Sequence, residues 1–157
     1  MQTKSFLGAL DHERIVKAIQ DAEARSRGEV RVHVSTRAVE DAPPPSRPSE
    51  AAVQAAAARR FEALGMTRTA ERNGVLLFVA PVSQTFAVIG DEAIHARCGP
   101  DFWKEVAAAV EADFRAGRFT DGIVKGVARV GEALATHFPR TPGAADTNEL
   151  PDEVTED

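Results

Sequence analysis

Hydrophobic residues follow a helical period in the first part of the chain and then switch to strict alternation. Between residues 6 and 26, apolar side chains recur every three or four positions, which predicts an amphipathic helix ended by Gly28. Residues 29–35 alternate polar with β-branched apolar side chains, so we expect a half-buried strand. Arg31 and His33 then face away from the apolar side of that strand.

Three further segments have a helical pattern, over residues 50–64, 100–116 and 121–137. Ser49 and Thr120 are the expected N-cap residues of the first and the third, and Pro100 suits the first position of the second. Gly122 and Gly126 lie four residues apart on the last helix. They predict its close approach to the sheet or to a neighbouring helix.

Residues 74–80 form a continuous apolar run, typical of a strand covered on both faces at the centre of a sheet. A short turn at 81–84 leads into an apolar strand over 85–90, which predicts an antiparallel hairpin. The strand at 29–35, the helix at 50–64 and the strand at 74–80 form a β-α-β crossover, so these two strands are expected to be parallel. The expected fold is therefore α/β, a three-layer α/β/α sandwich with a small mixed sheet flanked by helices.

Composition and charge fit one globular domain followed by an acidic tail. The chain has 157 residues, of which 43% are hydrophobic and 27% charged, and Cys98 is its single cysteine, which excludes an internal disulfide. Residues 1–139 are expected to form the domain. Residues 140–157 carry one arginine and six acids and are expected to be largely flexible, with Leu150 and Val154 as the candidate anchors.

These features also limit the expected partners. Because the charges of residues 1–139 balance and the tail is acidic, the chain lacks the basic surface that nucleic-acid phosphates require. No apolar run approaches the roughly 20 residues of a membrane span, and no signal-peptide segment is evident. We therefore expect a cytoplasmic monomer without membrane insertion, acting with a protein partner that the sequence does not identify.

The predicted topology brings distant acids to one end of the sheet, because the parallel strands begin there and the third strand ends there. The residues expected there are Glu29, Glu71, Asn73 and Asp91, with Glu23 and Asp121 approaching from the first and last helices. Several carboxylates and an amide oxygen suit a hard cation such as calcium or magnesium. The alternative is that these acids are solvated surface groups without an ion.

The opposite end of the sheet is where open α/β sheets often bind ligands. It offers Ser35, Thr36, Arg37, Ser83 and Gln84, which form no evident catalytic set. The sequence contains no G-x-S-x-G elbow, Walker loop or G-x-G-x-x-G motif. Neither a triad hydrolase nor a nucleotide-binding protein is therefore supported.

Several short motifs occur in a distinctive order. They are Gly28-Glu29-Val30, Glu71-Arg72-Asn73-Gly74-Val75, Ile89-Gly90-Asp91, Phe114-x-x-Gly117-x-Phe119 and Asn148-Glu149-Leu150-Pro151. In this order the chain resembles the TPM domain family, also called the TPM phosphatase family, over about residues 5–154. The resemblance implies an α/β/α sandwich and a divalent cation, often calcium, bound by loop carboxylates at one sheet edge. It assigns that role to Glu29, Glu71 and Asp91, and assigns no catalytic residue.

Three functions follow as alternatives. The first is a cation-binding accessory or interaction domain without established catalysis, using calcium or magnesium. The second is a metal-assisted acid phosphatase acting on phosphomonoesters, because some members of the resembled family are described as acid phosphatases. The third is a structural interaction domain without a ligand.

Overall fold

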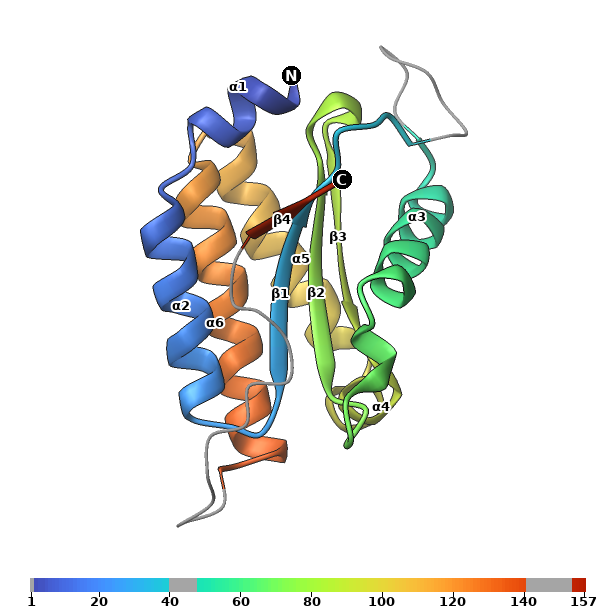
Figure 1. Ribbon diagram of the computed structural model, residues 1–157, viewed down its shortest axis with the longest axis vertical. Helices are drawn as coiled ribbons and strands as arrows, with labels where there is room; N and C mark the ends of the chain where they lie inside the picture. The colour runs from blue at the N-terminus through green and yellow to red at the C-terminus, as the bar shows by residue number, and fades with distance from the viewer. Residues whose placement is uncertain (1, 40–47, 141–153) are drawn as a thin grey trace.

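The computed structural model describes residues 2–39, 48–140 and 154–157. A mixed sheet lies between two helical layers (Figure 1). Its strands are β1 (Glu29–Val34), β2 (Gly74–Ala80), β3 (Thr85–Gly90) and β4 (Val154–Glu156). The α-helices are α1 (Thr3–Gly8), α2 (His12–Ala24), α3 (Glu50–Ala63), α4 (Glu92–Cys98), α5 (Pro100–Arg115) and α6 (Phe119–His137). Short 3-10 helices, η1 (Met66–Arg68) and η2 (Pro81–Ser83), precede and follow β2.

The order of the strands is β3-β2-β1-β4. β1 pairs with β2 in parallel, from Glu29 beside Gly74 to Val34 beside Val79, and β2 pairs with β3 antiparallel. The predicted β-α-β crossover and hairpin are thus confirmed, and so is the α/β sandwich.

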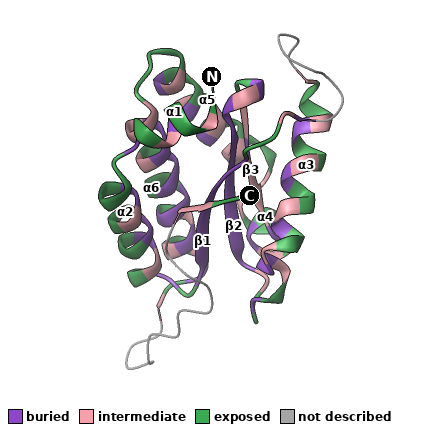
Figure 2. Ribbon diagram, turned by 45° about the horizontal axis from the view of Figure 1, so that its top comes forward, coloured by how far each residue is buried: buried purple, intermediate pink, exposed green. Residues whose placement is uncertain are grey.

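Two apolar cores fill the spaces on either side of the sheet. Because successive side chains of a strand point to opposite faces, Val75 and Leu77 of β2 enter the core under α2, α5 and α6, whereas Leu76 and Phe78 enter the core under α3. This double burial explains the continuous apolar run of β2. Figure 2 shows β1 and β2 buried along their length, with exposed residues on the outer sides of the helices.

The helix predicted over residues 6–26 is wrong in one respect, because the structure divides it into α1 and α2. Asp11 begins α2, where its side chain accepts a hydrogen bond from the Arg14 N–H at 3.2 Å. The Asp11 N–H donates to the Thr120 hydroxyl at 3.0 Å. α1 is held separately through Phe6, which is only 2% exposed.

The other predicted helices are present with small changes. Ser49 caps α3 as expected, accepting from the Ala52 N–H at 3.1 Å, and Pro100 opens α5. Thr120 is not the cap of α6, because that helix begins at Phe119 and Thr120 bonds to α2 instead. Among the described residues, no helix is long and apolar enough to cross a membrane.

The last residues of the predicted acidic tail are attached to the domain. Residues 154–156 form β4, which pairs in parallel with β1, placing Val154 beside Val32 and Thr155 beside His33. Val154, expected as an anchor, packs against the core below α2 and α6. Leu150 and the rest of residues 141–153 lie outside the described residues.

Candidate functional site

Three of the polar residues predicted to meet at the beginning of the parallel strands lie there. Glu29 is the register partner of Gly74, and the Asp91 N–H donates to the carbonyl oxygen of Gly74 at 2.8 Å. Asn73 donates from Nδ2 to the carbonyl oxygen of Arg27 at 3.2 Å. Glu29, Asn73 and Asp91 are all buried. These three residues therefore lie at the end of the sheet that the topology indicates, and their role as cation ligands stays a prediction.

The carboxylate of Asp91 is fully engaged. Arg72 donates to it from Nε at 2.8 Å and from Nη2 at 2.9 Å, and the Glu92 N–H donates to Oδ1 at 2.8 Å, which caps α4. Arg72 also pairs with the Glu92 carboxylate at 3.4 Å. The hydrogen bond to Asp91 raises the pKa of Arg72. Arg72 has a positive φ of 53°, a strained backbone conformation for a residue that is not glycine.

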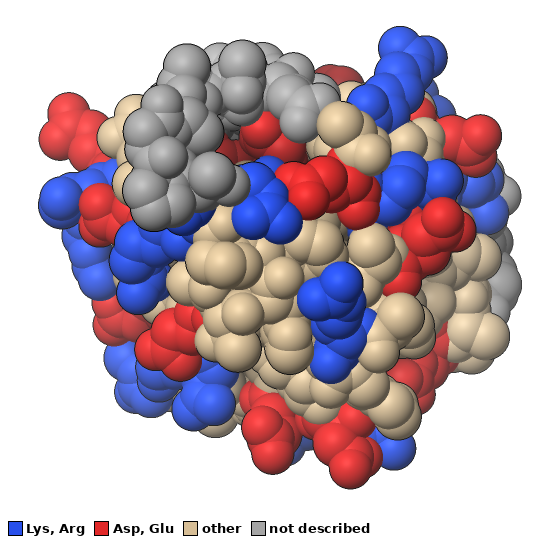
Figure 3. Space-filling view, turned by 90° about the horizontal axis from the view of Figure 1, so that it is seen from below, with Lys and Arg blue, Asp and Glu red and all other residues tan. Residues whose placement is uncertain are grey.

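Glu71 is engaged in the same way by a second arginine. Arg27 donates from Nε to Oε2 at 2.8 Å and from Nη2 to Oε1 at 3.0 Å, and its Nη1 donates to the carbonyl oxygen of Pro139 at 2.6 Å. In Figure 3, which views this end of the molecule, basic side chains lie beside acidic ones around an area of other residues, and a basic side chain also lies within that area. The edge predicted to be acidic is thus largely neutralised by arginine.

Glu23 of α2 and Asp121 of α6, both predicted near this edge, lie at different ends of the sheet. Glu23 reaches the start of β1, where its Oε2 accepts from the Val30 N–H at 2.9 Å. Asp121 does not approach this edge, and that prediction is wrong. α5 carries the chain back to the opposite end of the sheet before α6 begins, so Asp121 lies there and pairs with Arg14 at 2.9 Å.

This arrangement does not fit a divalent cation as it stands. Within residues 2–39, 48–140 and 154–157, no three histidine, cysteine or acidic side chains are grouped so that they would hold a metal ion. The oxygen atoms of Asp91 and Glu71 instead accept hydrogen bonds from guanidinium groups. Calcium or magnesium binding at this edge remains a prediction.

The opposite end of the sheet holds a more complete polar site, which we call the Asp157 pocket and define as His33, Ser35, Thr36 and Arg60 around the Asp157 carboxylate. Oδ1 lies 2.7 Å from His33 Nε2 and 2.9 Å from Arg60 Nη2. Oδ2 accepts from the Ser35 hydroxyl at 2.8 Å, the Thr36 N–H at 2.8 Å and the Thr36 hydroxyl at 3.2 Å. Residues from β1, the following turn and α3 therefore converge on one carboxylate.

Burial and hydrogen bonding set the protonation states of Asp157 and His33. Burial acts to raise the pKa of Asp157, but hydrogen bonds from His33, Ser35 and the Thr36 N–H, with the charge of Arg60, outweigh it and lower the pKa strongly. Burial lowers the pKa of His33 more than the bond to Asp157 raises it. An ionised carboxylate only accepts hydrogen bonds, so Nε2 of a neutral His33 carries the proton toward Asp157.

The Asp157 pocket is suited to binding a carboxylate group. Ser35 and His33 donate hydrogen bonds to the same carboxylate, so Ser35 is not paired with His33 as a base. The pKa of Asp157 is lowered, which makes its carboxylate a weak base. Sequence reasoning placed Ser35 and Thr36 at this end of the sheet but missed Asp157 and Arg60. Asp157 follows a strand of only three residues, which is too short to give a recognisable period.

Comparison with known proteins identifies the family of this chain. Residues 1–133 match the TPM domain. The chain belongs to the TPM domain family. An NMR structure of BA42 protein from the psychrophilic bacterium Bizionia argentinensis is similar, with a TM-score of 0.77 and 35% sequence identity over 95% of this chain and 96% of that chain. No curated protein matches the chain.

A buried arginine lies near the Asp157 pocket of this TPM domain. Arg31 lies two residues before His33 on the same face of β1 and is 7% exposed. Within the described part of the chain, its buried Nε has no hydrogen-bond partner. Buried polar groups in native proteins usually have a partner, so Arg31 is an unusual donor close to a built carboxylate site.

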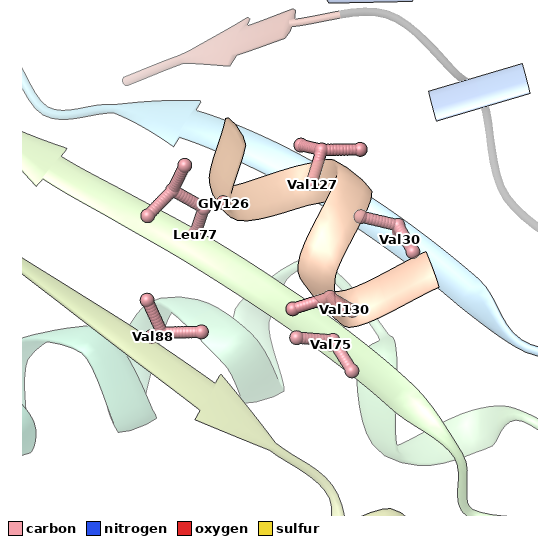
Figure 4. A pocket seen from close by; sticks show the side chains of 7 residues that line it. All are labelled: Val30, Val75, Leu77, Val88, Gly126, Val127 and Val130. Carbon is pink, nitrogen blue, oxygen red and sulfur yellow. The ribbon is translucent and has the colours of Figure 1, made fainter. Parts of the chain in front are cut away.

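The sheet also borders a small cavity under α6, shown in Figure 4. Its lining is apolar: Val30, Val75, Leu77, Val88, Gly126, Val127 and Val130. The space measures about 10 Å³, room for one water molecule at most. The TPM domain therefore offers no ligand site there.

Proposed function

We propose that this TPM domain is a non-catalytic interaction domain that receives an extended chain segment at the outer edge of β1. The observation that carries the proposal is the attachment of β4. Only three residues of β4 pair with β1, yet the Asp157 carboxylate that follows is held by His33, two hydroxyl groups, a backbone N–H and Arg60. Strand addition at a sheet edge, with side-chain pockets that supply specificity, is a recurring mode of peptide recognition.

The arrangement of reactive groups supports binding over catalysis. Ser35 and His33 both bind the same carboxylate, so they do not form a nucleophile and its base. The buried carboxylate of Asp91 accepts from Arg72 and caps α4, which favours a structural role. The phosphatase alternative would need a carboxylate available for a cation or for proton transfer.

Divalent-cation binding is a second candidate, favoured by the convergence of Glu29, Asn73 and Asp91 on one edge. It depends on the release of Asp91 by Arg72. Arg72 is 40% exposed, so solvent can receive its side chain when the pair with the buried Asp91 carboxylate opens.

Two measurements on the purified chain separate these functions. Hydrolysis of an aryl phosphate, with and without magnesium, is expected to stay at the buffer level for the natural chain and for Asp91→Asn. Reproducible hydrolysis that disappears in Asp91→Asn would establish the phosphatase and contradict the proposal. A calcium titration followed by amide NMR tests the second candidate, for which saturable shifts at Asn73 and Asp91 are the expected sign.

A further inference from the structure

We infer that the Asp157 pocket is the anchor site for an acidic residue of a protein partner, whose extended strand replaces β4 beside β1. The inference rests on the proposed function and specifies its partner. The partner is a chain segment in which an apolar residue, a serine or threonine, any residue and an acid follow one another.

The pocket is a built site for a carboxylate. His33 is completely buried, and its Nε2 lies 2.7 Å from Asp157 Oδ1. Ser35 is 7% exposed and donates to Oδ2 at 2.8 Å. The bond from Arg60 is charge-assisted, which makes it stronger than a bond between neutral groups. The five donors satisfy both carboxylate oxygens, so an amide or a hydroxyl in this place would leave donors unpaired.

The register of β4 gives the rest of the pattern. Val154 lies beside Val32 and packs against the core under α2 and α6, which calls for an apolar residue. Thr155 lies beside His33, and its hydroxyl is 2.8 Å from His33 Nδ1. Glu156 is exposed and places no demand on the partner. The acid then comes opposite Ser35, two residues after the hydroxyl residue.

Charge complementarity with the buried Arg31 extends the pattern by one position. In a parallel strand with this register, the residue two positions before the one beside His33 lies beside Arg31, on the same face of the sheet. The buried Nε of Arg31 has no hydrogen-bond partner among the described residues. In the sequence, the position beside Arg31 corresponds to Glu153, which lies outside the described residues. A carboxylate suits the charge of Arg31, so the full pattern is acid, apolar, serine or threonine, any residue, acid.

Exchange of β4 breaks few backbone contacts with β1, because the strand is short. It spans three residues, of which Val154 and Thr155 are half-buried. Its attachment to the same chain gives it a high effective concentration at the pocket, so a partner competes best when the Asp157 carboxylate is removed.

The test uses the full chain with Asp157→Ala and a fluorescent peptide, acetyl-EVTEDG-amide, followed by anisotropy. We expect the peptide to bind Asp157→Ala about tenfold more tightly than the natural chain, because the internal competitor is lost. Glu156→Gln is the matched control and should bind as the natural chain does. If Asp157→Ala fails to fold, Asp157→Asn, which keeps the size of the side chain, replaces it.

Three further comparisons locate the anchor. The peptide EVTENG should bind Asp157→Ala about tenfold more weakly than EVTEDG. The reason is that an amide group cannot accept hydrogen bonds from all the donors of the pocket. Arg60→Ala in the same variant should remove most of that difference. Arg31→Gln should weaken EVTEDG while leaving QVTEDG unchanged.

Results that contradict this inference can be distinguished from results that contradict the proposed function. Equal binding of EVTEDG and EVTENG would overturn the acidic anchor while leaving strand addition, and hence the proposed function, in place. Absence of binding by any peptide to folded Asp157→Ala would overturn the inference, with the hydrolysis assay still deciding between binding and catalysis. Sedimentation of the natural chain as a dimer that Asp157→Ala dissociates would also overturn it, because the occupant would then be a second copy.

Discussion

Arg72 lies across the carboxylate of Asp91, with its Nε 2.8 Å from Oδ2 and its Nη2 2.9 Å from Oδ1. The guanidinium group thereby neutralises the buried carboxylate, as a bound cation would. Because Arg72 is itself 40% exposed, solvent can receive its side chain when the pair opens.

Removing the guanidinium group should therefore favour a divalent ion. We expect Arg72→Gln to bind calcium about tenfold more tightly than the natural chain, since Asp91 would lose its competing positive charge. The measurement is an NMR titration that follows the amides of Asn73 and Asp91. Arg68→Gln, at an exposed position on η1, is the matched control and should change nothing. Identical titrations for the two variants would count against an ion at this edge.

Stability should fall in two steps as the pH falls. The pKa of His33 in the folded chain is lowered below its ordinary value of 6.5. As the pH falls below 6.5, the unfolded chain therefore binds a proton at this histidine before the folded chain does, and the free energy of unfolding decreases. The pKa of Asp157 is lowered from 3.8, so a second loss begins below that pH for the same reason.

Urea midpoints between pH 3 and pH 8 would resolve these two steps. His33→Gln should lack the first step and keep the second. His12→Gln alters an exposed histidine at the start of α2 and is the matched control. A first step of the same size in His33→Gln would assign it to another group.

Gly131 sets the distance between α2 and α6. A Cβ atom at this position would lie 2.7 Å from the Ala22 Cβ and 3.1 Å from the Ala22 Cα, a backbone atom that cannot move aside cheaply. We expect Gly131→Ala to destabilise the domain by about 1–3 kcal/mol, because overpacking outweighs the gain in helix propensity. Chemical denaturation measures the change. Gly8→Ala, with no atom within 4 Å of the added group, should be neutral or slightly stabilising.

Phe6 attaches α1 to the rest of the fold. Its ring lies 5.0 Å from that of Phe119 and 6.2 Å from that of Phe114, measured between centroids. Phe6→Ala should lower the free energy of unfolding by about 3–5 kcal/mol, whereas Phe6→Leu should cost less because it refills most of the volume. Equal losses in the two variants would mean that ring geometry, rather than volume, holds α1 in place.

The layered scaffold was predictable because it depends on strong, long patterns. The apolar run of β2 and the alternation of β1 fixed their places in the sheet, and the crossover rule then gave the parallel direction. The position of Asp91 beside Gly74 followed from that topology alone. Gly126 likewise lies where a Cβ atom would come 2.9 Å from Val110 of α5, as its spacing from Gly122 predicted.

The pairing of individual charges was not predictable in this way. Nothing in the local pattern indicates that Arg72 and Arg27 reach Asp91 and Glu71, because these pairs form across turns that meet only in three dimensions. The predicted position of Asp121 was wrong because the end of the sheet at which α6 begins depends on the direction of α5. The sequence pattern does not give that direction. The three-residue strand β4 had no period from which to infer a partner.

The two cores of the sandwich are unequal, and this has a consequence for β4. Among the described residues, nineteen buried residues form the core under α2, α5 and α6, whereas nine form the core under α3. The thinner layer should open at a lower free energy than global unfolding, so amide hydrogens of α3 should exchange earlier than those of α6. Arg60 belongs to α3, so each transient opening of that helix withdraws a positive charge from Asp157. Opening of α3 should therefore weaken the attachment of β4 to β1.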